Sequence, residues 1–271
     1  MEGAQRKMPV SMVILTKNES DGISDCLKSV FGWADEIIIV DDESTDNTRD
    51  ICTNFTERIF VRKMELEGKQ RNFGAQQARN EWVMMMDADE RMTPEVKQEV
   101  EGVVAYGNKE VVAYWVPRKN YIGDYWLRYG GWYPAPHIKL YKKDFLKWKE
   151  IPADVVHPGI EIAKGFRGGQ LKSCLIHYNF KNVEDFIQKV NRQTTLEAIK
   201  WHLHGKKMSL GKGMWRILDR FCRRFIGKKG YRDGYYGFVA AVLSGFYQFA
   251  AYSKYRELKE KGFYLDRIKQ C

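Results

Sequence analysis

Three carboxylates within four positions, Asp87-Ala88-Asp89-Glu90, directly follow an apolar run at residues 82–86. Carboxylates this close together repel one another unless a cation compensates their charge. Mg²⁺ and Mn²⁺ take oxygen ligands, often one or two carboxylates together with phosphate oxygens. The spacing therefore indicates a divalent cation that carries a diphosphate. A solvated turn before the next helix is the alternative, because Asp-x-Asp also occurs by chance.

A second acidic pair, Asp41 and Asp42, follows the apolar run at residues 36–40. These side chains suit recognition of a nucleobase and of ribose hydroxyls. Ser44 or Thr45 is predicted to cap a helix over residues 46–56. Capping leaves the two aspartates unexplained.

Two positive side chains, Lys69 and Arg71, open a helix predicted over residues 68–79. Cations at a helix N-terminus suit a diphosphate, which the helix end itself also attracts. An ordinary solvated basic face is the alternative.

The elements that must position these residues alternate between strand and helix. Strands are predicted at 10–15, 36–40, 58–61 and 82–86, and helices at 23–31, 46–56 and 68–79. Apolar strands that alternate with helices indicate an α/β fold with a parallel sheet covered on both faces. Ligands bind beyond the carboxyl ends of such strands. Those ends carry Lys17-Asn18-Glu19, Asp41-Asp42 and Asp87-Ala88-Asp89.

The composition sets the class of protein. The 271 residues are 44% hydrophobic, so the chain can bury a sizeable core, and the net charge of +10 indicates an anionic partner. The five cysteines are scattered without CxxC spacing, which disfavours a disulfide framework or zinc site and fits a reducing cytosol. The apolar run at the N-terminus is too short for a signal peptide.

Composition changes along the chain and predicts a boundary between 1–181 and 182–271. Within the first part, the strand–helix alternation covers about 9–95, and about 96–181 is rich in aromatic residues and Gly/Pro pairs. Strands are expected there at 111–116 and 138–141. A helical region follows at 182–271, where Asn182 is predicted to cap the first helix.

The helical region is basic and aromatic. Between residues 201 and 232, ten Lys or Arg residues and one acid are interleaved with apolar residues. Ile217, Phe221 and Phe225 recur near helical spacing, with Trp215 and Ile226 near the same face. This pattern is typical of an interfacial helix on an anionic membrane. A helix that covers the catalytic domain, or a nucleic-acid surface, is the alternative.

The next segment, residues 235–252, is uncharged over eighteen positions, close to the roughly 20 that span a bilayer. It contains a stripe of small or polar residues: Gly237, Ala241, Ser244, Gly245 and Gln248. Such a stripe favours packing against another helix. A peripheral or shallowly inserted hairpin is therefore predicted in place of a span.

The chain resembles family 2 glycosyltransferases of the inverting GT-A type. The matching stretches are VILTKNES (13–20), WADEIIIVDDESTDNT (33–48), GKQRNFGAQQARNEWVMMMDADER (68–91) and GGWYPAPHIKLY (130–141). Within the family it is most similar to the lipopolysaccharide-core type, whose members glycosylate membrane-borne acceptors. The resemblance implies a GT-A glycosyltransferase domain at 1–181. Its Rossmann-like nucleotide-sugar half would be at about 9–95 and its acceptor half at about 96–181.

The resemblance also implies a UDP-linked sugar donor and a Mg²⁺ or Mn²⁺ ion. Asp89 would be the chief metal ligand, Asp87 would contact metal or ribose, and His177 would complete the metal shell or contact phosphate. The implied donor site comprises Thr16, Asn18, Glu19, Asp41, Asp42, Lys69, Arg71, Asp87 and Ala88. Trp132 and Tyr133 would stack on the acceptor sugar. Structural roles are the alternative for His177 and for both aromatic residues.

An inverting transfer needs a general base that deprotonates the acceptor hydroxyl. Relatives carry a His-Glu pair after the GGWYP stretch, but this chain reads ADVVHPGIE, with Pro158 in place of the Glu. Asp154, His157 and Glu161 are the candidates. Asp154 is favoured because a carboxylate is the usual base, and His157 has the alternative role of capping a turn.

The predicted activity is sugar transfer to a lipid-linked glycan or lipopolysaccharide-core acceptor, with the enzyme peripheral or monotopic at the cytoplasmic face of the membrane. A nucleotidyltransferase is one alternative, although no glycine-rich basic loop follows the first strand. A nucleic-acid binder driven by the positive charge is the other. The acidic strand ends would repel phosphates that lack a metal, so no nucleic acid is expected.

Overall fold

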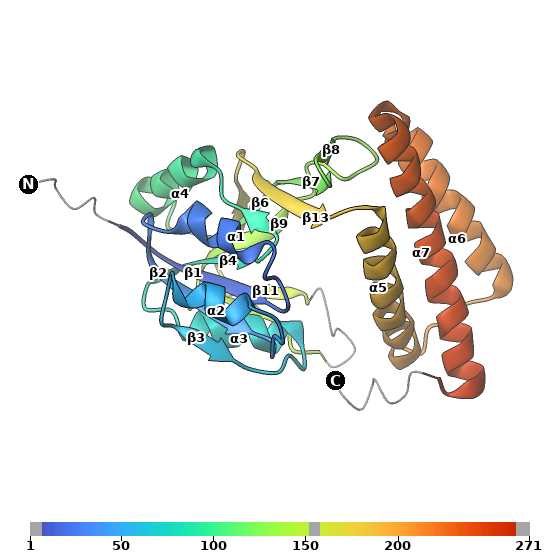
Figure 1. Ribbon diagram of the computed structural model, residues 1–271, viewed down its shortest axis with the longest axis horizontal. Coiled ribbons are helices and arrows are strands. Elements are labelled where there is room, and N and C mark those ends of the chain that lie inside the picture. Colours follow the sequence, from blue (N-terminus) through green and yellow to red (C-terminus); the bar gives the residue numbers. More distant parts are fainter. Residues whose placement is uncertain (1–6, 152–157, 264–271) are drawn as a thin grey trace, which may run out of the picture. The chain divides into compact units, whose positions relative to one another are not determined.

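The computed structural model describes residues 7–151 and 158–263 (Figure 1). Its chain divides into two units. Unit 1 comprises the described parts of Met1–Arg118, Pro136–Glu150 and Pro158–His177, and unit 2 those of Lys119–Ala135, Ile151–His157 and Tyr178–Cys271. The predicted boundary between residues 181 and 182 stays a prediction.

Among the described residues, unit 1 builds a seven-stranded sheet. In spatial order its strands are β12 (Arg167–Gln170), β6 (Val111–Val116), β9 (His137–Lys142), β4 (Trp82–Asp87), β1 (Met8–Thr16), β2 (Ala34–Asp41) and β3 (Ile59–Val61). The β4-β1-β2-β3 segment is parallel, and β9 runs antiparallel to both of its neighbours. The predicted α/β class with a mostly parallel central sheet is therefore confirmed.

The central strand β1 pairs with β2 on one side and with β4 on the other. Thr16 lies opposite Asp41, and Leu15 lies opposite Asp87. In a parallel ladder the carboxyl ends meet at one edge of the sheet. The three polar strand ends therefore converge, as the sequence predicts.

Helices cover both faces of this sheet (Figure 1). The helices of unit 1 are α1 (Ile23–Val30), α2 (Thr48–Thr53), α3 (Glu67–Gln76) and α4 (Pro94–Tyr106). Successive strand residues point to opposite faces. Met12 accordingly packs with Leu27 of α1 and Val96 of α4, whereas Val13 packs with Ala75 of α3.

Helix α2 is shorter than predicted and begins at Thr48. The prediction that Ser44 or Thr45 caps it is wrong. Ser44 uses its hydroxyl to donate a 2.5 Å hydrogen bond to Asp41. The Asp46 carboxylate instead accepts a hydrogen bond from the Thr48 backbone N–H at 3.0 Å.

Further short strands lie outside the seven-stranded sheet. They are β5 (Glu90–Arg91), β10 (Leu146–Trp148), β11 (Ile160–Ile162) and β13 (Leu175–Phe180). The antiparallel pairing of β5 with β13 sets His177 opposite Glu90. This pairing brings a residue far along the chain beside the acidic end of β4.

Unit 2 contains long helices and a small hairpin. Its elements are β7 (Arg118–Ile122), which pairs with β8 (Tyr125–Leu127), and the helices α5 (Val183–Leu203), α6 (Leu210–Cys222) and α7 (Gly234–Lys261). The Asn182 side chain accepts a hydrogen bond from Asp185 N at 2.8 Å, so the predicted cap of α5 is confirmed. A π-helical turn (Arg223–Gly227) and a 3-10 turn (Gly230–Asp233) connect α6 to α7.

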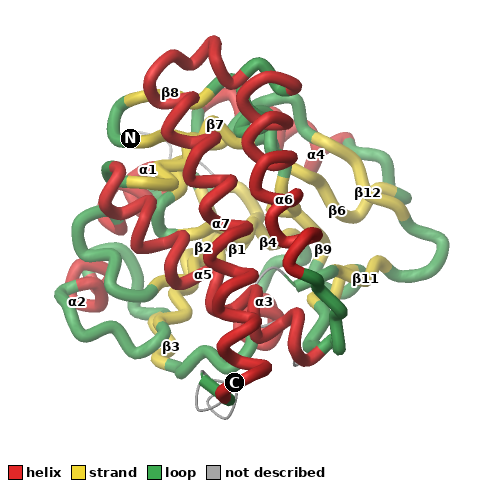
Figure 2. Tube along the Cα trace, turned by 90° about the vertical axis from the view of Figure 1, so that its right-hand side faces the viewer, coloured by secondary structure: helices red, strands yellow, loops and turns green. Residues whose placement is uncertain are grey.

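Helix α7 contacts both α5 and α6 (Figure 2). The predicted packing role of its small residues is confirmed at several positions. Gly245 lies against Ile217 and Phe221 of α6, and Gln248 accepts a 2.8 Å hydrogen bond from Arg216. In the described part of the chain, no helix combines the length and the apolar character that crossing a bilayer demands.

The predicted apolar stripe of the basic segment is only partly exposed. Ile217, Phe221 and Phe225 are half-buried because they pack against α7, where both Phe rings contact Phe238. Trp215 and Ile226, predicted near the same face, are exposed. The exposed apolar side chains of α6 lie on a neighbouring face of the helix, which includes Leu218.

Candidate active site

Asp87, at the end of β4, is held by two cations. Its Oδ1 accepts a hydrogen bond from Arg71 Nη2 at 3.0 Å, and its Oδ2 accepts one from Lys139 Nζ at 2.8 Å. Arg71 belongs to α3 and also donates to Glu67, one helical turn earlier, at 2.8 Å. Lys139 comes from β9, the strand beside β4. The negative charge of the first Asp of the Asp-x-Asp motif is thus balanced by cations of the protein itself.

Glu90 extends this ion pair into a buried network. Its Oε2 accepts hydrogen bonds from Lys139 Nζ at 2.5 Å and from Asp87 N at 3.0 Å, and its Oε1 accepts one from Arg118 at 3.2 Å. The side chain of Glu90 is fully buried and that of Lys139 is 2% exposed. Buried charges are tolerated only when they are paired. Here every charge has a partner, and Lys139 connects the end of β4 to the neighbouring strand β9.

The charge states of this network follow from its geometry. Burial alone would raise the pKa of the Asp87 carboxyl, but Lys139 and Arg71 outweigh burial and hold that pKa well below its usual range. Burial would lower the pKa of Arg71, and the carboxylates of Asp87 and Glu67 outweigh it and raise that pKa. Asp87 is consequently an anion, and Arg71 a cation, at neutral pH.

Asp89, the second Asp of the motif, faces His177. The distance between Asp89 Oδ1 and His177 Nε2 is 3.4 Å, and the imidazole is almost buried. Within residues 7–151 and 158–263, no group of three or more His, Cys, Asp or Glu side chains is arranged to hold a metal ion. A carboxylate and an imidazole nevertheless fit a cation whose remaining ligands come from a diphosphate. The roles of Asp89 and His177 as metal ligands stay predictions.

The loops after β1 and β2 are tied together by hydrogen bonds. Asn18 Oδ1 accepts a hydrogen bond from Thr45 N at 2.8 Å, and Asn18 N donates one to Ser44 Oγ at 2.9 Å. Asp41 is fully buried and accepts hydrogen bonds from both the N–H and the hydroxyl of Ser44. The next loop residue, Glu19, donates its N–H to Thr48 Oγ1 at 2.8 Å. The predicted donor-binding residues of these two loops therefore share one rigid structure.

Asp42 and Thr16 lie at the same edge of the sheet. Asp42 is 7% exposed and accepts hydrogen bonds from Lys17 Nζ at 2.8 Å and from Met64 N at 2.7 Å. The Thr16 hydroxyl is buried and has no hydrogen-bond partner among the described residues. A buried hydroxyl without a partner is unfavourable in a protein interior. The Thr16 hydroxyl is therefore available to form a hydrogen bond with a bound ligand.

Two other predicted donor residues differ in their surroundings. Ala88 is buried, and its carbonyl accepts a 2.9 Å hydrogen bond from Arg91. Lys69 is 39% exposed and forms a 2.9 Å ion pair with Glu65. Lys69 therefore lies on the solvated side of α3, whereas Arg71 points into the network at Asp87.

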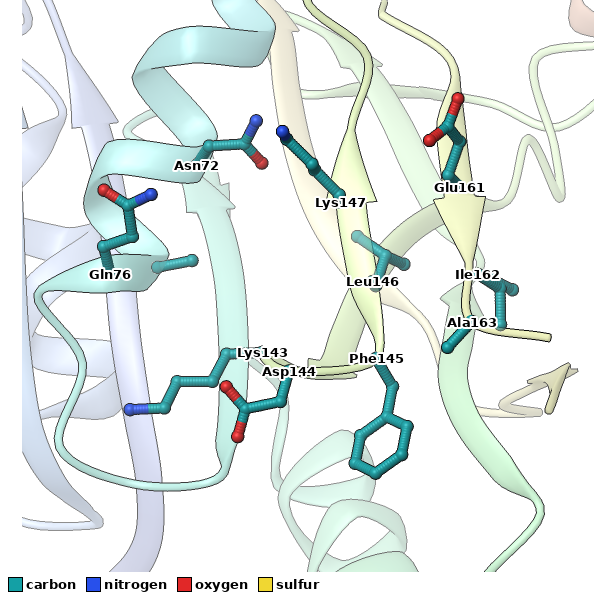
Figure 3. A pocket seen from close by; sticks show the side chains of 11 residues that line it. Asn72, Gln76, Lys143, Asp144, Phe145, Leu146, Lys147, Glu161, Ile162 and Ala163 are labelled. Carbon is teal, nitrogen blue, oxygen red and sulfur yellow. The ribbon is translucent and has the colours of Figure 1, made fainter. Parts of the chain in front are cut away.

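Glu161, a predicted candidate for the general base, lies on β11. Its side chain is 66% exposed, with its carboxylate 3.7 Å from Lys149 Nζ. It lines an open pocket of about 660 Å³, where Figure 3 shows Asn72 of α3 across from Lys147 of β10. The residues predicted to bind donor or metal do not line this pocket. Asp154 and His157, the other candidates for the base, lie outside the described residues.

The two predicted acceptor residues belong to unit 2. Trp132 is half-buried, where its ring packs edge-on against Phe180 and Phe186 and lies beneath the guanidinium of Arg224. Tyr133 is 36% exposed. Of the two rings, that of Tyr133 is the more accessible to a sugar.

Sequence reasoning did not assign a role to Lys139, Glu90 or Arg118. The available signal was the position of Lys139 within the apolar strand HIKLY, since a lysine is almost never fully buried unless it is paired. Its partners could not be inferred because they lie 49 and 52 positions away in the chain.

Similar proteins of known family identify the family of this chain. Residues 11–159, more than half of the chain, match the family described as Glycosyl transferase family 2. An uncharacterized glycosyltransferase of Rickettsia typhi is 29% identical over 261 residues, which cover 93% of this chain and 88% of the relative. The lipopolysaccharide core biosynthesis glycosyltransferase LpsC of Rhizobium meliloti is 25% identical over 253 residues, 92% of each chain.

Among solved structures, mannosyl-3-phosphoglycerate synthase from Rubrobacter xylanophilus is similar, with a TM-score of 0.46 and 15% identity over 74% of this chain and 76% of that one. The family match and the glycosyltransferase relatives decide the identity. This chain is a nucleotide-sugar-dependent glycosyltransferase and belongs to glycosyl transferase family 2.

Proposed function

We propose that this glycosyltransferase transfers a sugar, with inversion, from a UDP-sugar to a lipid-linked glycan of the lipopolysaccharide-core kind, and that Mg²⁺ or Mn²⁺ takes part. The relative LpsC supports the acceptor class, because its name places it in lipopolysaccharide core biosynthesis. The family membership supports a nucleotide-sugar donor.

One observation carries the metal-dependent form of the proposal. The Asp89 carboxylate faces the His177 imidazole at 3.4 Å, at the edge of the sheet where three polar strand ends meet. Asp89 and His177 would hold the cation together with the donor diphosphate. Such an ion stabilises negative charge on a leaving diphosphate, an effect of several kcal/mol.

The neighbouring residues have distinct roles in this proposal. Arg71 is fixed at the motif through Asp87, so it would meet the diphosphate without a large rearrangement. Asp87 would contact the ribose while it stays paired with Arg71 and Lys139. To act as a metal ligand instead, it would have to release one of these two cations. Preorganised charges of this kind require little reorganisation during the reaction.

The nucleoside would lie along the ends of β1 and β2. Asp42 would contact the uracil, while Asp41 would hold the loop in place through Ser44. The Thr16 hydroxyl, which has no hydrogen-bond partner within the described part of the chain, would gain one from the nucleotide. Asn18 and Glu19 would complete this wall of the pocket.

The test is release of UDP from a panel of UDP-sugars with Mn²⁺. Asp89→Ala should reduce UDP release by about a hundredfold or more, because several kcal/mol of leaving-group stabilisation is lost. His177→Ala should lower it less, since the carboxylate ligand remains. Asp25→Ala, an exposed carboxylate on α1, is the matched control and should match the wild type.

Equal turnover by Asp89→Ala and the wild type would refute the metal assignment. Release of pyrophosphate from a nucleoside triphosphate, with no UDP from any UDP-sugar, would refute the proposed donor.

A further inference from the structure

Helix α7 presents an uninterrupted apolar stripe to solvent. The exposed residues of this stripe are Tyr235, Phe238, Val242, Phe246 and Phe249, with exposed fractions from 41% to 69%. They recur every three or four positions and therefore share one face of the helix. The remaining faces of α7 pack against α5 and α6.

Helix α6 adds a second exposed apolar stripe. Its large exposed residues are Leu210, Met214, Trp215 and Leu218, and Ile226 follows in the π-helical turn, all between 52% and 67% exposed. Phe221 and Phe225 bridge the two stripes, because both rings contact Phe238 of α7 at centroid distances of 6.2 and 5.8 Å. The two stripes thus form one surface on the α6–α7 hairpin, named here the docking face, and Figure 2 shows the two helices side by side.

Positive charge borders the docking face. The turns between the two helices expose Lys228, Lys229 and Arg232, and Lys212 is exposed on α6. The sole acid between residues 201 and 232 is Asp219, and it is paired with Arg223 at 2.9 Å. Residues 235–252 carry no charge. The arrangement is an apolar centre with a basic border.

A contiguous apolar surface of this kind usually marks an interaction site. Two copies of the docking face would bring their basic borders together, so self-association is disfavoured. A nucleic acid would require cations across the face, where α7 has only apolar side chains. An anionic bilayer satisfies both features, since aromatic and aliphatic side chains enter below the headgroups while Lys and Arg meet the phosphates.

We propose that the docking face binds the surface of an anionic phospholipid bilayer and holds the enzyme there without spanning it. This proposal rests on the proposed function only in that a lipid-borne acceptor would lie at such a surface. It also gives a physical basis to the predicted location at the cytoplasmic membrane face. Trp215 and Ile226 of the predicted stripe belong to the docking face, whereas Ile217 is half-buried against α7.

The experiment is co-sedimentation of the full chain with vesicles of equal parts phosphatidylcholine and phosphatidylglycerol, and with vesicles of phosphatidylcholine alone. The wild type should bind the anionic vesicles at least tenfold more strongly and should lose this preference at high salt. The combined variant Trp215→Gln/Phe246→Gln/Phe249→Gln should bind the anionic vesicles at least tenfold more weakly.

A second variant tests the basic border. Lys212→Gln/Lys228→Gln/Lys229→Asn should lose the preference for anionic vesicles, and Asn suits the left-handed backbone at Lys229, where φ is +57°. The matched control is Tyr106→Gln/Lys109→Gln in unit 1, where Tyr106 is 92% exposed. It should bind as the wild type does.

The outcomes separate docking from catalysis. UDP release from a soluble donor, without acceptor or vesicles, should be unchanged in both docking-face variants, which also shows that they fold. A wild type that stays in the supernatant, or variants that sediment with vesicles as the wild type does, would overturn the docking proposal. The docking proposal would also be overturned if the wild type binds no vesicles and sedimentation velocity shows it to be a dimer that the aromatic variant converts to a monomer. Failure of UDP release in every protein would instead refute the proposed function and leave the docking result intact.

Discussion

At the scale of single residues, the site depends on the different surroundings of two aspartates two positions apart. Asp87 is paired with Arg71 and Lys139, whereas Asp89 faces His177. The same side chain type thus has two roles. The paired carboxylate organises the end of β4, and the other is the one to which the proposed function assigns a cation.

Lys139 gives the clearest prediction at this scale. Lys139→Met removes the cation shared by Asp87 and Glu90 and leaves buried negative charge without compensation. Breaking a buried ion pair from one side costs about 3–5 kcal/mol, so the free energy of unfolding in urea should fall by that amount. Lys147→Met, at the exposed position of β10, is the control and should change the free energy of unfolding by less than about 0.5 kcal/mol. A Lys139→Met protein as stable as the wild type would show that the network does not stabilise the fold.

At the scale of elements, close packing decides how α3 meets the sheet. A Cβ atom at Gly74 would lie 2.5 Å from Val13 Cγ1 and 3.2 Å from Val40 Cγ2. The helix can therefore approach β1 and β2 only because this position lacks a side chain. That approach also sets the position of Arg71 on the same helix.

Gly74→Ala and Gly102→Ala should have opposite effects. Alanine favours a helix over glycine by roughly 0.5–1 kcal/mol, but overpacking at Gly74 costs about 1–3 kcal/mol and should win. A Cβ at Gly102 of α4 meets nothing within 4 Å, so that variant should gain stability. Thermal unfolding of the two variants checks the signs. A rise in melting temperature for both would mean that α3 can move away from the sheet without loss.

The start of α2 predicts a pH dependence. Burial opposes ionisation of Asp46, but the hydrogen bonds from Thr48 and Ser20 together outweigh it and lower the pKa to about 2. A carboxyl with a depressed folded pKa stabilises the protein above its unfolded pKa of about 4, and this contribution is lost as pH falls from about 4 towards 2.

Asp46→Asn should therefore cost on the order of 1 kcal/mol at neutral pH, after solvent screening is allowed for. The difference from the wild type should shrink by about pH 3, as urea unfolding at several pH values would reveal. Asp124→Asn, in an exposed turn, serves as the comparison. A difference that stays constant between pH 7 and pH 3 would contradict the role of the Asp46 charge.

At the scale of the whole molecule, unit 1 brings the donor-site residues together and unit 2 exposes the docking face. Each unit has its own apolar clusters, so each can be stable around its own core. The positive net charge of +10 favours both kinds of anionic partner proposed, nucleotide and lipid.

Ligand binding should be visible as added stability of the whole chain. A UDP-sugar with Mn²⁺ at a hundredfold excess over Kd should stabilise the folded state by about 2.7 kcal/mol and raise the melting temperature by several degrees. The increase should exceed that from either component alone. If the rise in melting temperature with UDP-sugar is the same after the metal is chelated, the cation has no part in donor binding, although the proposed donor still holds.

Much of the fold was predictable because local pattern and topology agree. The apolar runs of β1, β2 and β4 alternate with helices, and the carboxyl ends of parallel strands lie at one edge of the sheet. The acidic strand ends could therefore be placed together before any contact was known. The shortened α2 was missed because Ser44 serves a neighbouring loop, which no local pattern records.

The sequence by itself determined the class of fold, the edge at which polar strand ends gather, and the basic, apolar character of the last helices. Only the tertiary structure decided which cation meets which carboxylate, because Lys139 reaches Asp87 through the insertion of β9 beside β4. It likewise decided which stripe of α6 stays exposed, since the packing of α7 covers Ile217 and Phe221 and leaves Leu218 in solvent. Periodicity defines the faces of a helix, but the neighbour that covers a face comes from distant parts of the chain.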